Sequence, residues 1–459
     1  MEAEHVDVVV IGMGPGGEYL AESLAEAGLS VAGVERRLVG GECPYYGCVP
    51  SKMMIRAANL LTEGRRIPDM AGSAQVTADW APVAARIRKE ATDNWDDQVA
   101  ADRFEDKGGM LARGQGRITG RGEVTVDRPD GPPRTFLARR GIVINTGTEP
   151  AIPPIEGLAG TPYWTNRDAM RTEEVPRSLI VLGGGAIGSE LAQIFARFGA
   201  EVAVVEAMPR LLSFDEPEAG DLVAKVFARE GITVRTGARA ERVAHDGSQF
   251  TVEVGGEHLR ADRLLVATGR RNNLAGLGLG AVGLDESARA VEVDDRMRAA
   301  DGVWAIGDIT GHGGYTHMSM YQAEIARRDI LGEDGATAVY RAVPRVSFTD
   351  PEVGSVGLTE AQARDQGLTV RTGVAQIPQT ARGWIHKAGN DGFIKLVEDA
   401  GRGVLVGATS AGPTGGEVLS ALVVAVHAEV PTATLRNMIY AYPTFHRGIE
   451  DALKNLTAS

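Results

Sequence analysis

A glycine-rich pattern that joins a strand to a helix constrains this chain most, because it sets the local fold wherever it occurs. Its first copy, Gly12-Met13-Gly14-Pro15-Gly16-Gly17, follows the β-branched run Val8 to Ile11. A helix-type pattern comes next, and a second short strand then ends at Glu35, 23 positions after Gly12. Such glycines let the backbone approach a pyrophosphate at a helix N-terminus, and the acid can accept hydrogen bonds from ribose. We therefore expect a dinucleotide site that includes Gly12, Gly14, Gly17 and Glu35.

The pattern occurs again in the middle of the chain. The strand Leu179 to Leu182 leads into Gly183-Gly184-Gly185-Ala186-Ile187-Gly188, and the strand after the next helix ends at Glu206, again 23 positions on. Two copies predict two dinucleotides. A carboxylate at the ribose suits a free 2′-hydroxyl and repels a 2′-phosphate, so we expect NAD, although Arg210 nearby keeps NADP open. The second site is expected to include Gly183, Gly185, Gly188 and Glu206.

The remaining segments predict how these units are joined. Asp79 to Gly108 carries apolar positions along a charged sequence, and we expect one amphipathic surface helix there. The run Ile142 to Gly147 closes the first unit, and Leu264 to Gly269 closes the second in the same way. Prolines follow the first closing run and predict a linker. The expected short strands are Met110 to Arg113, Arg117 to Thr119, Glu123 to Val126 and Arg134 to Ala138.

Both cysteines of the chain lie in one stretch, GGECPYYGCVPSK, which runs from Gly40 to Lys52. Residues five apart in a regular helix are about 7.5 Å apart along its axis, whereas a disulfide needs Cα atoms within roughly 7 Å. Cys43 and Cys48 can therefore form a disulfide only where the backbone departs from a helix, which Pro44, Gly47 and Pro50 favour. We interpret the pair as a redox-active dithiol; a structural disulfide and a metal site are the alternatives.

Composition excludes several classes of protein. The net charge of -13 argues against nucleic acid or an anionic membrane surface as a partner. No apolar run approaches the ~20 residues of a transmembrane helix, and the acidic N-terminus enters a strand directly, unlike a signal peptide. We therefore expect a cytoplasmic protein with no membrane partner. A chain of 459 residues predicts about three domains.

Together these motifs resemble the flavin-dependent pyridine nucleotide-disulfide oxidoreductases, the group of dihydrolipoamide dehydrogenase and mercuric reductase. The resemblance covers essentially the whole chain. It rests on the two fingerprints, the C-x-x-x-x-C-V-P-S-K stretch and four further segments, which are ATGRR at 267–271, VWAIGD at 303–308, YTH at 315–317 and FTDPEVGSVG at 348–357.

The resemblance implies an α/β fold with two Rossmann-like dinucleotide-binding domains of the three-layer ββα type and an α+β C-terminal dimerisation domain. The implied divisions are an FAD-binding domain at 1–150 and 271–338, an NAD(P)-binding domain at 151–270 inserted between them, and an interface domain at 339–459. The implied assembly is a homodimer, and the implied cofactors are FAD and NAD, with NADP possible.

The resemblance also implies roles for single residues. Cys48 would be the thiol beside the flavin, and Cys43 the outer thiol that exchanges with substrate. Lys52, one helical turn beyond Cys48, would lie by the flavin and pair with Glu190. A lysine and a helix N-terminus both lower a thiol pKa, which supports this arrangement. Further cofactor contacts are expected at Gly41, Lys52, Thr146, Gly147, Gly307 and Asp308, and at Gly269 in the second unit; no metal site is expected.

The C-terminal segment departs from the family. Relatives that reduce small disulfides carry a His-Pro-Thr motif with a Glu five residues after the His, and that His is the acid and base for the outer thiol. Tyr442 stands at the His position and Arg447 at the Glu position. A phenol of pKa about 10 is only about one part in a thousand ionised at neutral pH, so Tyr442 can donate a proton but is a poor resting base. His446 is the alternative acid and base.

These departures leave three types of reaction open. In the first, NADH reduces FAD, the electrons pass to the Cys43–Cys48 disulfide, and a disulfide or other sulfur compound accepts them. In the second, a quinone or dye takes electrons directly from the flavin and the dithiol is auxiliary. The third is the thioether-cleaving reaction of a carboxylating relative, which also lacks the His and has Pro after its first cysteine, as Pro44 is here.

Overall fold

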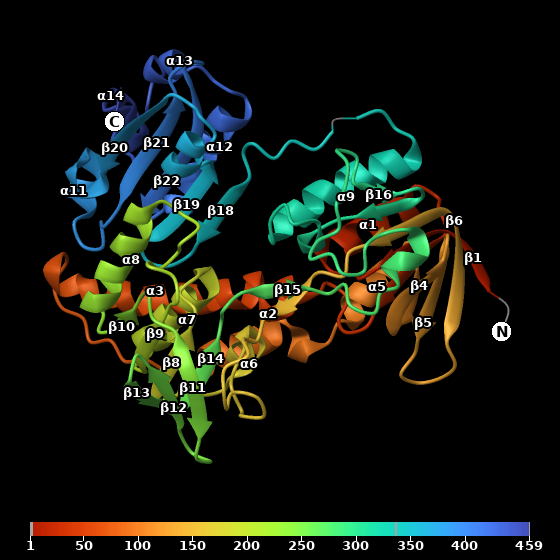
Figure 1. The fold of residues 1–459 in the computed structure, drawn as a ribbon. Coiled ribbons are helices and arrows are strands. Elements are labelled where there is room, and N and C mark those ends of the chain that lie inside the picture. The colour runs from red at the N-terminus through yellow and green to blue at the C-terminus, as the bar shows by residue number, and fades with distance from the viewer. Residues whose placement is uncertain (1–2, 336, 459) are drawn as a thin grey trace. The chain divides into compact units, whose positions relative to one another are not determined.

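The computed structural model describes residues 3–335 and 337–458, and these form two compact units (Figure 1). The first comprises the described residues up to Pro50, together with Arg86–Ala151 and Arg270–Tyr340. The second comprises Ser51–Ala85, Ile152–Gly269 and the described residues from Arg341 onward. No helix in the described ranges has both the length and the apolar character needed to span a bilayer.

The first unit is built on an 8-stranded sheet whose central order is β16-β17-β6-β1-β2-β3. The strands β1 (Glu4–Ile11), β2 (Val31–Glu35), β3 (Met110–Arg113), β6 (Arg134–Ile144) and β17 (Val303–Ala305) are parallel. Helix α1 (Pro15–Glu26) connects β1 to β2, which is the crossover that the first fingerprint predicts. The edge strand β16 (Arg298–Ala300) and the hairpin β4 (Gln115–Gly120) with β5 (Glu123–Asp127) are antiparallel.

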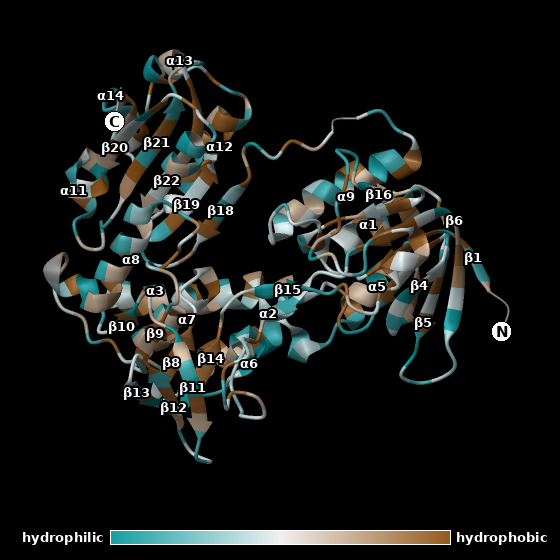
Figure 2. Cartoon of the chain, viewed as in Figure 1, coloured by the Kyte–Doolittle hydropathy of each residue, from teal (hydrophilic) through white to brown (hydrophobic). Residues whose placement is uncertain are grey.

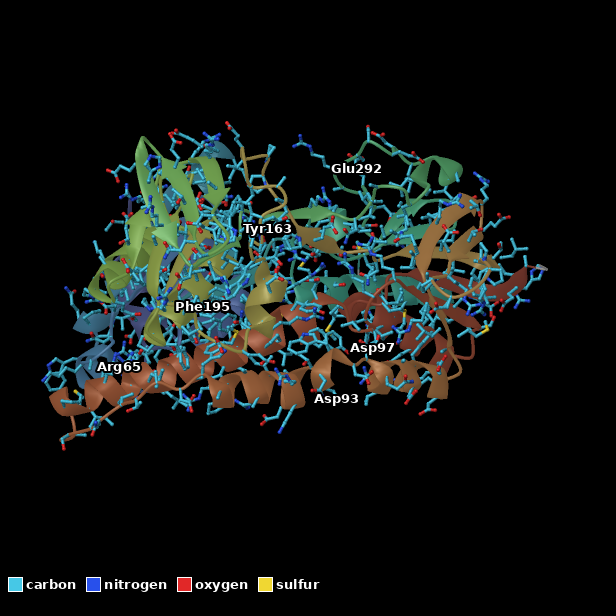
Figure 3. All side chains as sticks on the ribbon, turned by 90° about the horizontal axis from the view of Figure 1, so that it is seen from below. Arg65, Asp93, Asp97, Tyr163, Phe195 and Glu292 are labelled. Carbon is cyan, nitrogen blue, oxygen red and sulfur yellow. The ribbon has the colours of Figure 1, made fainter. Side chains whose placement is uncertain are left out.

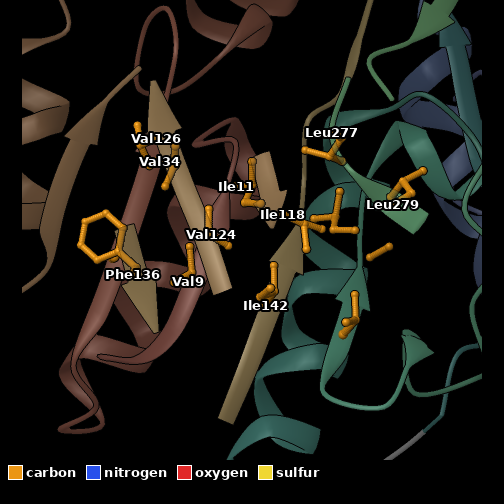
Figure 4. Close-up of a cluster of buried hydrophobic side chains, with 14 of the residues drawn as sticks. Val9, Ile11, Val34, Ile118, Val124, Val126, Phe136, Ile142, Leu277 and Leu279 are labelled. Carbon is orange, nitrogen blue, oxygen red and sulfur yellow. The ribbon is translucent and has the colours of Figure 1, made fainter. Parts of the chain in front are cut away.

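Apolar side chains fill both faces of this sheet. On one face, Figure 4 shows Val9, Ile11, Val34 and Phe136 together with side chains of the β4–β5 hairpin and of the 274–279 segment. On the other face, Leu20 and Leu24 of α1 pack with residues of α9 (Thr316–Leu331). The hydrophobic run Val8 to Ile11 in β1 fits a strand that is buried on both faces.

The strand β6 is longer than the sequence predicted. Arg134 to Ala138 and Ile142 onward were expected as separate strands, but they form one strand of 11 residues. Gly141 lies where the two parts meet. Only a glycine fits there, because a Cβ would lie 2.1 Å from the carbonyl oxygen of Gly302. The glycine lets the neighbouring backbone approach closely, and the strand continues through it.

The prediction of one helix from Asp79 to Gly108 was wrong. The segment contains α4 (Ala81–Arg86), the π-helical turn η2 (Ile87–Ala91), the 3₁₀ turn η3 (Asp93–Trp95) and α5 (Gln98–Asp106). Asp93, Asn94 and Trp95 have φ angles of 44°, 59° and 57°. Left-handed backbone costs about 1–2 kcal/mol for each non-glycine residue, and it ends the right-handed helix here. Asn is among the few residues that adopt it readily.

The second unit contains three sheets. A parallel sheet of order β10-β9-β8-β14 uses β8 (Ser178–Leu182), β9 (Glu201–Val205), β10 (Thr233–Arg235) and β14 (Arg263–Val266), with α7 (Ala186–Arg197) as the β8–β9 crossover. The strands β8, β9 and β14 are mostly in hydrophobic colours in Figure 2, as expected for a buried parallel sheet. The antiparallel strands β11 (Ala240–His245), β12 (Phe250–Val254) and β13 (Glu257–Ala261) form a separate sheet.

The third sheet of this unit is C-terminal and antiparallel, with order β18-β19-β22-β21-β20-β23. Its strands are β18 (Pro344–Ser347), β19 (Glu352–Gly357), β20 (Val370–Gln376), β21 (Phe393–Asp399), β22 (Val404–Gly412) and β23 (Thr457–Ala458). Helix α12 (Gly415–His427) packs on it through Leu419 and Leu422, and α14 (Gly448–Lys454) through Ala452 and Leu453. The predicted α/β fold class with a separate C-terminal α+β part is confirmed.

Residues 51–85, expected in the first domain, belong to the second unit. Helix α3 (Cys48–Arg66) and the segment after it contact the rest of that unit through hydrogen bonds, ion pairs and aromatic rings. The guanidinium of Arg66 donates to Asp350 at 3.0 Å, and Arg197 donates to Asn59 at 2.6 Å. The ring of Trp80 lies edge-on to that of Phe198 at 4.9 Å between centroids. The three-domain division with boundaries at 150, 270 and 338 stays a prediction.

Candidate active site

The first and third glycines of each fingerprint are required by the chain's own backbone. A Cβ at Gly12 would lie 2.3 Å from the carbonyl oxygen of Asn145, and one at Gly17 would lie 2.0 Å from that of Gly12. The second copy repeats this packing, because a Cβ at Gly188 would lie 1.9 Å from the carbonyl oxygen of Gly183. These glycines let the strand, loop and helix pack closely.

The middle glycine of each fingerprint has no such requirement. A Cβ at Gly14 would lie at an ordinary contact distance, 3.6 Å, from the side-chain amide nitrogen of Asn145, and one at Gly185 would meet nothing within 4 Å. Both residues also have ordinary extended backbone angles. Each loop therefore leaves an open cradle at the N-terminus of a helix, which suits the pyrophosphate of a dinucleotide. Nearby, the buried hydroxyl of Thr146 makes no hydrogen bond.

The two acids that end the second strands make the same contacts. Glu35 accepts from the backbone N–H of Met13 at 2.9 Å and from that of Arg37 at 2.7 Å. Glu206 accepts from Gly184 at 2.5 Å and from Met208 at 2.6 Å. Burial raises the pKa of Glu35, and the two backbone donors oppose that effect. Each acid thus fixes its glycine loop, and the expected contact with ribose stays a prediction.

The other residues expected at the first dinucleotide lie around the same loop. Gly41 packs closely on Gly14, because a Cβ added at Gly41 would lie 2.8 Å from the Gly14 Cα. Gly307 has φ 79°, and its N–H donates to Gln322 at 2.7 Å. Asp308 accepts from the Thr148 hydroxyl at 2.6 Å. Gly147 has φ 62° and no atom close to an added Cβ, and Gly269 in the second unit has φ 120° and is equally open.

The cysteine pair lies on either side of a break in the helix. Cys43 is in the short helix α2 (Glu42–Tyr46), and Cys48 begins α3. Gly47 between them has φ -130° and ψ -115°, which is the departure from regular helix that a disulfide requires. The two cysteines are not joined by a disulfide in this structure; Cys43 is half-buried and Cys48 is exposed. The Cys48 sulfur lies 3.4 Å from the Thr316 hydroxyl, a residue to which the sequence analysis gave no role.

The two thiols affect each other's ionisation. The hydrogen bond with Cys48 raises the pKa of the Cys43 thiol above its ordinary value, burial raises it further, and Thr316 acts in the opposite direction. Two interacting groups lose their protons in steps that belong to the pair. The contact with Cys48 therefore makes it difficult for the reduced pair to take on a second negative charge at Cys43.

Lys52 and Glu190 form the ion pair that the resemblance implies. The Lys52 ammonium donates to Glu190 Oε2 at 2.9 Å and lies 4.6 Å from the centroid of the Phe348 ring. Glu190 is buried and also accepts from the backbone N–H of Phe348 at 2.8 Å. The Lys52 side chain keeps 35% of its surface exposed, so a cation is held firmly at a solvent-accessible position.

The C-terminal segment brings Tyr442 and Arg447 together. The guanidinium of Arg447 lies 5.3 Å from the Tyr442 ring centroid, and both residues line a small cavity with Thr380, Arg382 and others. The Tyr442 side chain is 70% exposed. The ring of His446 packs instead on buried Tyr440, 5.2 Å between centroids. Among the described residues, no cluster of His, Cys, Asp and Glu has the arrangement of a metal site.

Residues 6–328 match the family described as pyridine nucleotide-disulphide oxidoreductase, and residues 343–453 match the dimerisation domain of the same family. The dihydrolipoyl dehydrogenase of Chlorobaculum tepidum is 34% identical over 98% of this chain and 97% of its own length. The mercuric reductase of Shewanella putrefaciens is 34% identical over 96% of this chain and 80% of its own length.

Solved structures are also similar to this chain over nearly its whole length. A copper(II) complex of the HOCl-induced flavoprotein disulfide reductase RclA from Escherichia coli superposes with a TM-score of 0.86 at 27% identity, covering 99% of each chain. LpdA from Mycobacterium tuberculosis superposes with a TM-score of 0.86 at 26% identity, covering 99% of this chain and 100% of its own.

Proposed function

The chain belongs to the pyridine nucleotide-disulphide oxidoreductase family, and from this premise we propose that it is an NADH-dependent reductase of a disulfide or other sulfur compound. The family uses FAD and NAD(P)H, and each fingerprint loop supplies one open cradle for a dinucleotide. When bound, FAD would take a hydride equivalent from the nicotinamide and supply an electron pair to the Cys43–Cys48 disulfide. Gly183, Gly185, Gly188 and Glu206 would bind NADH, and the residues around Gly12 and Asp308 would bind FAD.

The observation that carries this proposal is the helix break at Gly47, with a cysteine on each side of it. The reduced pair can reduce a substrate disulfide in two exchange steps. Cys43 attacks one substrate sulfur, forms a mixed disulfide and releases the other sulfur as a thiol. Cys48 then attacks the Cys43 sulfur, releases the second substrate thiol and closes the Cys43–Cys48 disulfide. Two electrons and two protons pass to the substrate, and two substrate thiols are formed.

The protonation of the departing sulfur is the step in which this chain would differ from relatives that carry the His-Pro-Thr motif. Tyr442 stands at the position of the family histidine and is exposed beside Arg447. An ordinary phenol donates to a thiolate of pKa ~8.5 uphill by about 2 kcal/mol, which permits slow turnover. We propose Tyr442 as the acid, with His446 as the alternative. A homodimer would complete the site, since residues 343–453 match the family's dimerisation domain.

An anaerobic titration with NADH tests the first half of the reaction. We expect the flavin to bleach after the disulfide has been reduced, with a long-wavelength absorbance band from the Cys48 thiolate beside oxidised flavin. NADPH in place of NADH should be at least about tenfold less effective, because Glu206 repels the 2′-phosphate. A protein that takes up no FAD, or whose flavin does not respond to either nucleotide, would contradict the proposal.

A quinone is the second candidate acceptor, and the exposed Tyr442 in place of an imidazole favours it. A quinone reduced at the flavin needs no acid for a departing thiolate. The substitution Cys43→Ser separates the candidates: it abolishes disulfide reduction and largely spares quinone reduction. The electron acceptors tested should also include copper(II) and mercury(II) ions. Similar proteins include a disulfide reductase solved as a copper(II) complex and mercuric reductases.

A further inference from the structure

A strained segment lies next to the cysteine pair in the first unit. Asp93, Asn94 and Trp95 are three consecutive residues with positive φ (the position of Asp93 is labelled in Figure 3). Left-handed backbone in a row of non-glycine residues persists only where other contacts determine it. The three residues follow the π-helical turn Ile87–Ala91, a type of turn that is frequent at functional sites.

The segment is fixed at both ends. Buried Thr92 accepts from the backbone N–H of Trp95 at 3.3 Å and donates to the carbonyl oxygen of Ile87 at 3.1 Å. Buried Asp97 forms two hydrogen bonds with the Arg113 guanidinium, at 2.6 and 2.8 Å. Asp97 also accepts from the backbone N–H of Val39 at 2.5 Å. Val39 directly precedes the glycine pair that leads into α2, so one end of the segment supports the chain just before Cys43.

Trp95 supports the same turn from its other side. Its indole N–H donates to the carbonyl oxygen of Tyr45 at 3.3 Å. The last carbonyl groups of a helix have no donor within that helix, and α2 ends at Gly47 after only five residues. The break that separates the two cysteines therefore leaves the Tyr45 carbonyl in need of an outside donor. Trp95, held by its unusual backbone, supplies that donor.

We propose that the segment Thr92–Asp97 is a brace for the redox-active turn, and that Trp95 is a positioning residue for Cys43. This inference rests on the proposed disulfide reduction. The brace holds α2 at Tyr45 and the chain before α2 at Val39, on both sides of the outer thiol. Small displacements of a reacting group strongly reduce the rate of a reaction that depends on alignment. The flavin half of the reaction does not depend on the position of Cys43.

The test compares Trp95→Phe with Trp80→Phe in the full-length holoenzyme. Trp80 is a matched control, because its indole N–H also donates to a backbone carbonyl, that of Thr172 at 3.0 Å, in the other unit. We expect Trp95→Phe to lower NADH-dependent reduction of 5,5′-dithiobis(2-nitrobenzoate) about fivefold, the factor expected from the loss of one hydrogen bond. Reduction of ferricyanide by the same protein should stay unchanged. Trp80→Phe should leave the ratio of the two activities at the wild-type value.

A second readout reports on the turn itself. The contact with Cys48 raises the pKa of Cys43, so a looser turn should move the pH midpoint of Cys43 alkylation by iodoacetamide to a lower value in Trp95→Phe. If Trp95→Phe does not fold, Thr92→Val removes the hydroxyl that holds Trp95 and should give the same changes. An unaltered activity ratio and an unaltered alkylation midpoint would overturn the brace. Absence of disulfide reduction in the wild type would refute the proposed function, while the alkylation midpoint would still test the brace.

Discussion

The Lys52 ammonium and the Glu190 carboxylate lie 2.9 Å apart, but the two groups differ in their access to water. The Glu190 side chain is 6% exposed, whereas that of Lys52 is 35% exposed. Glu190 has one other donor, the backbone N–H of Phe348. Removal of Lys52 therefore leaves a buried carboxylate, whereas removal of Glu190 leaves an ammonium group that water can reach. A buried carboxylate without its cation is the more unfavourable of the two.

We expect Lys52→Met to destabilise the second unit by about 2 kcal/mol and Glu190→Gln by about 1 kcal/mol or less. In Glu190→Gln the lysine can be hydrated, and the glutamine can still accept from Phe348. Thermal unfolding of the two variants at equal FAD content measures the difference. Equal losses of stability, or a greater loss for Glu190→Gln, would contradict this asymmetry.

The fingerprint units could be predicted from the sequence because their signals are local. Glycines that pack on neighbouring backbone, such as Gly12 and Gly17, appear at fixed spacing within one strand-turn-helix unit. The family resemblance supplied the Lys52–Glu190 contact, which joins residues 138 positions apart. Propensity and spacing alone carry no information about such a pair.

The break at 92–97 was missed for a physical reason. The apolar spacing of this segment fits a helix on both sides, and the left-handed turn is determined by Thr92, Asp97 and their distant partners. The adjacent Asp93 and Asn94 were the available local signal, because Asp and Asn tolerate left-handed backbone. The contact of Trp95 with Tyr45 and that of Thr316 with Cys48 depend on tertiary packing and had no counterpart in the sequence pattern.

The middle glycine of the second fingerprint offers a test of nucleotide binding without a change in fold. Gly185→Ala places its Cβ in open space at an ordinary φ of -73°, so we expect no loss of thermal stability. The methyl group would occupy the cradle for the pyrophosphate, and the KM for NADH should rise at least about tenfold.

The matched control for that variant is Gly188→Ala. Its Cβ would lie 1.9 Å from the carbonyl oxygen of Gly183, so the loop must move, at about 1–3 kcal/mol or more. Thermal unfolding should detect this loss in Gly188→Ala and not in Gly185→Ala. A Gly185→Ala protein with unchanged KM would show that the dinucleotide does not use this cradle.

The reduced cysteine pair gives predictions of opposite sign for two variants. Cys48 is the main cause of the raised pKa of Cys43, so Cys48→Ala should lower that pKa. The Thr316 hydroxyl acts the other way, so Thr316→Val should raise it. The rate of Cys43 alkylation by iodoacetamide follows the thiolate fraction. Its pH profile should therefore move to lower pH in Cys48→Ala and to higher pH in Thr316→Val. Shifts in the same direction would refute this assignment.

The contact of Arg447 with Tyr442 leads to a gain-of-function prediction. The family's acid–base pair is a His followed five residues later by a Glu, and these are the positions that Tyr442 and Arg447 occupy here. The double substitution Tyr442→His with Arg447→Glu supplies an imidazole that can be base and acid near neutral pH, held by a carboxylate. General acid–base catalysis contributes about 10²–10⁴-fold where its groups are well placed. We expect lipoamide reduction by NADH to rise at least about tenfold.

The single substitution Tyr442→His separates the two contributions. With Arg447 still beside it, the imidazole lacks its carboxylate and faces a cation that disfavours the protonated form. Its gain should therefore be smaller than that of the double variant and confined to lower pH, where the imidazole still carries the proton that it donates. Quinone reduction should be the same in all three proteins, since it needs no acid at position 442. A double variant with unchanged lipoamide turnover would show that the phenol is not what limits sulfur exchange in this chain.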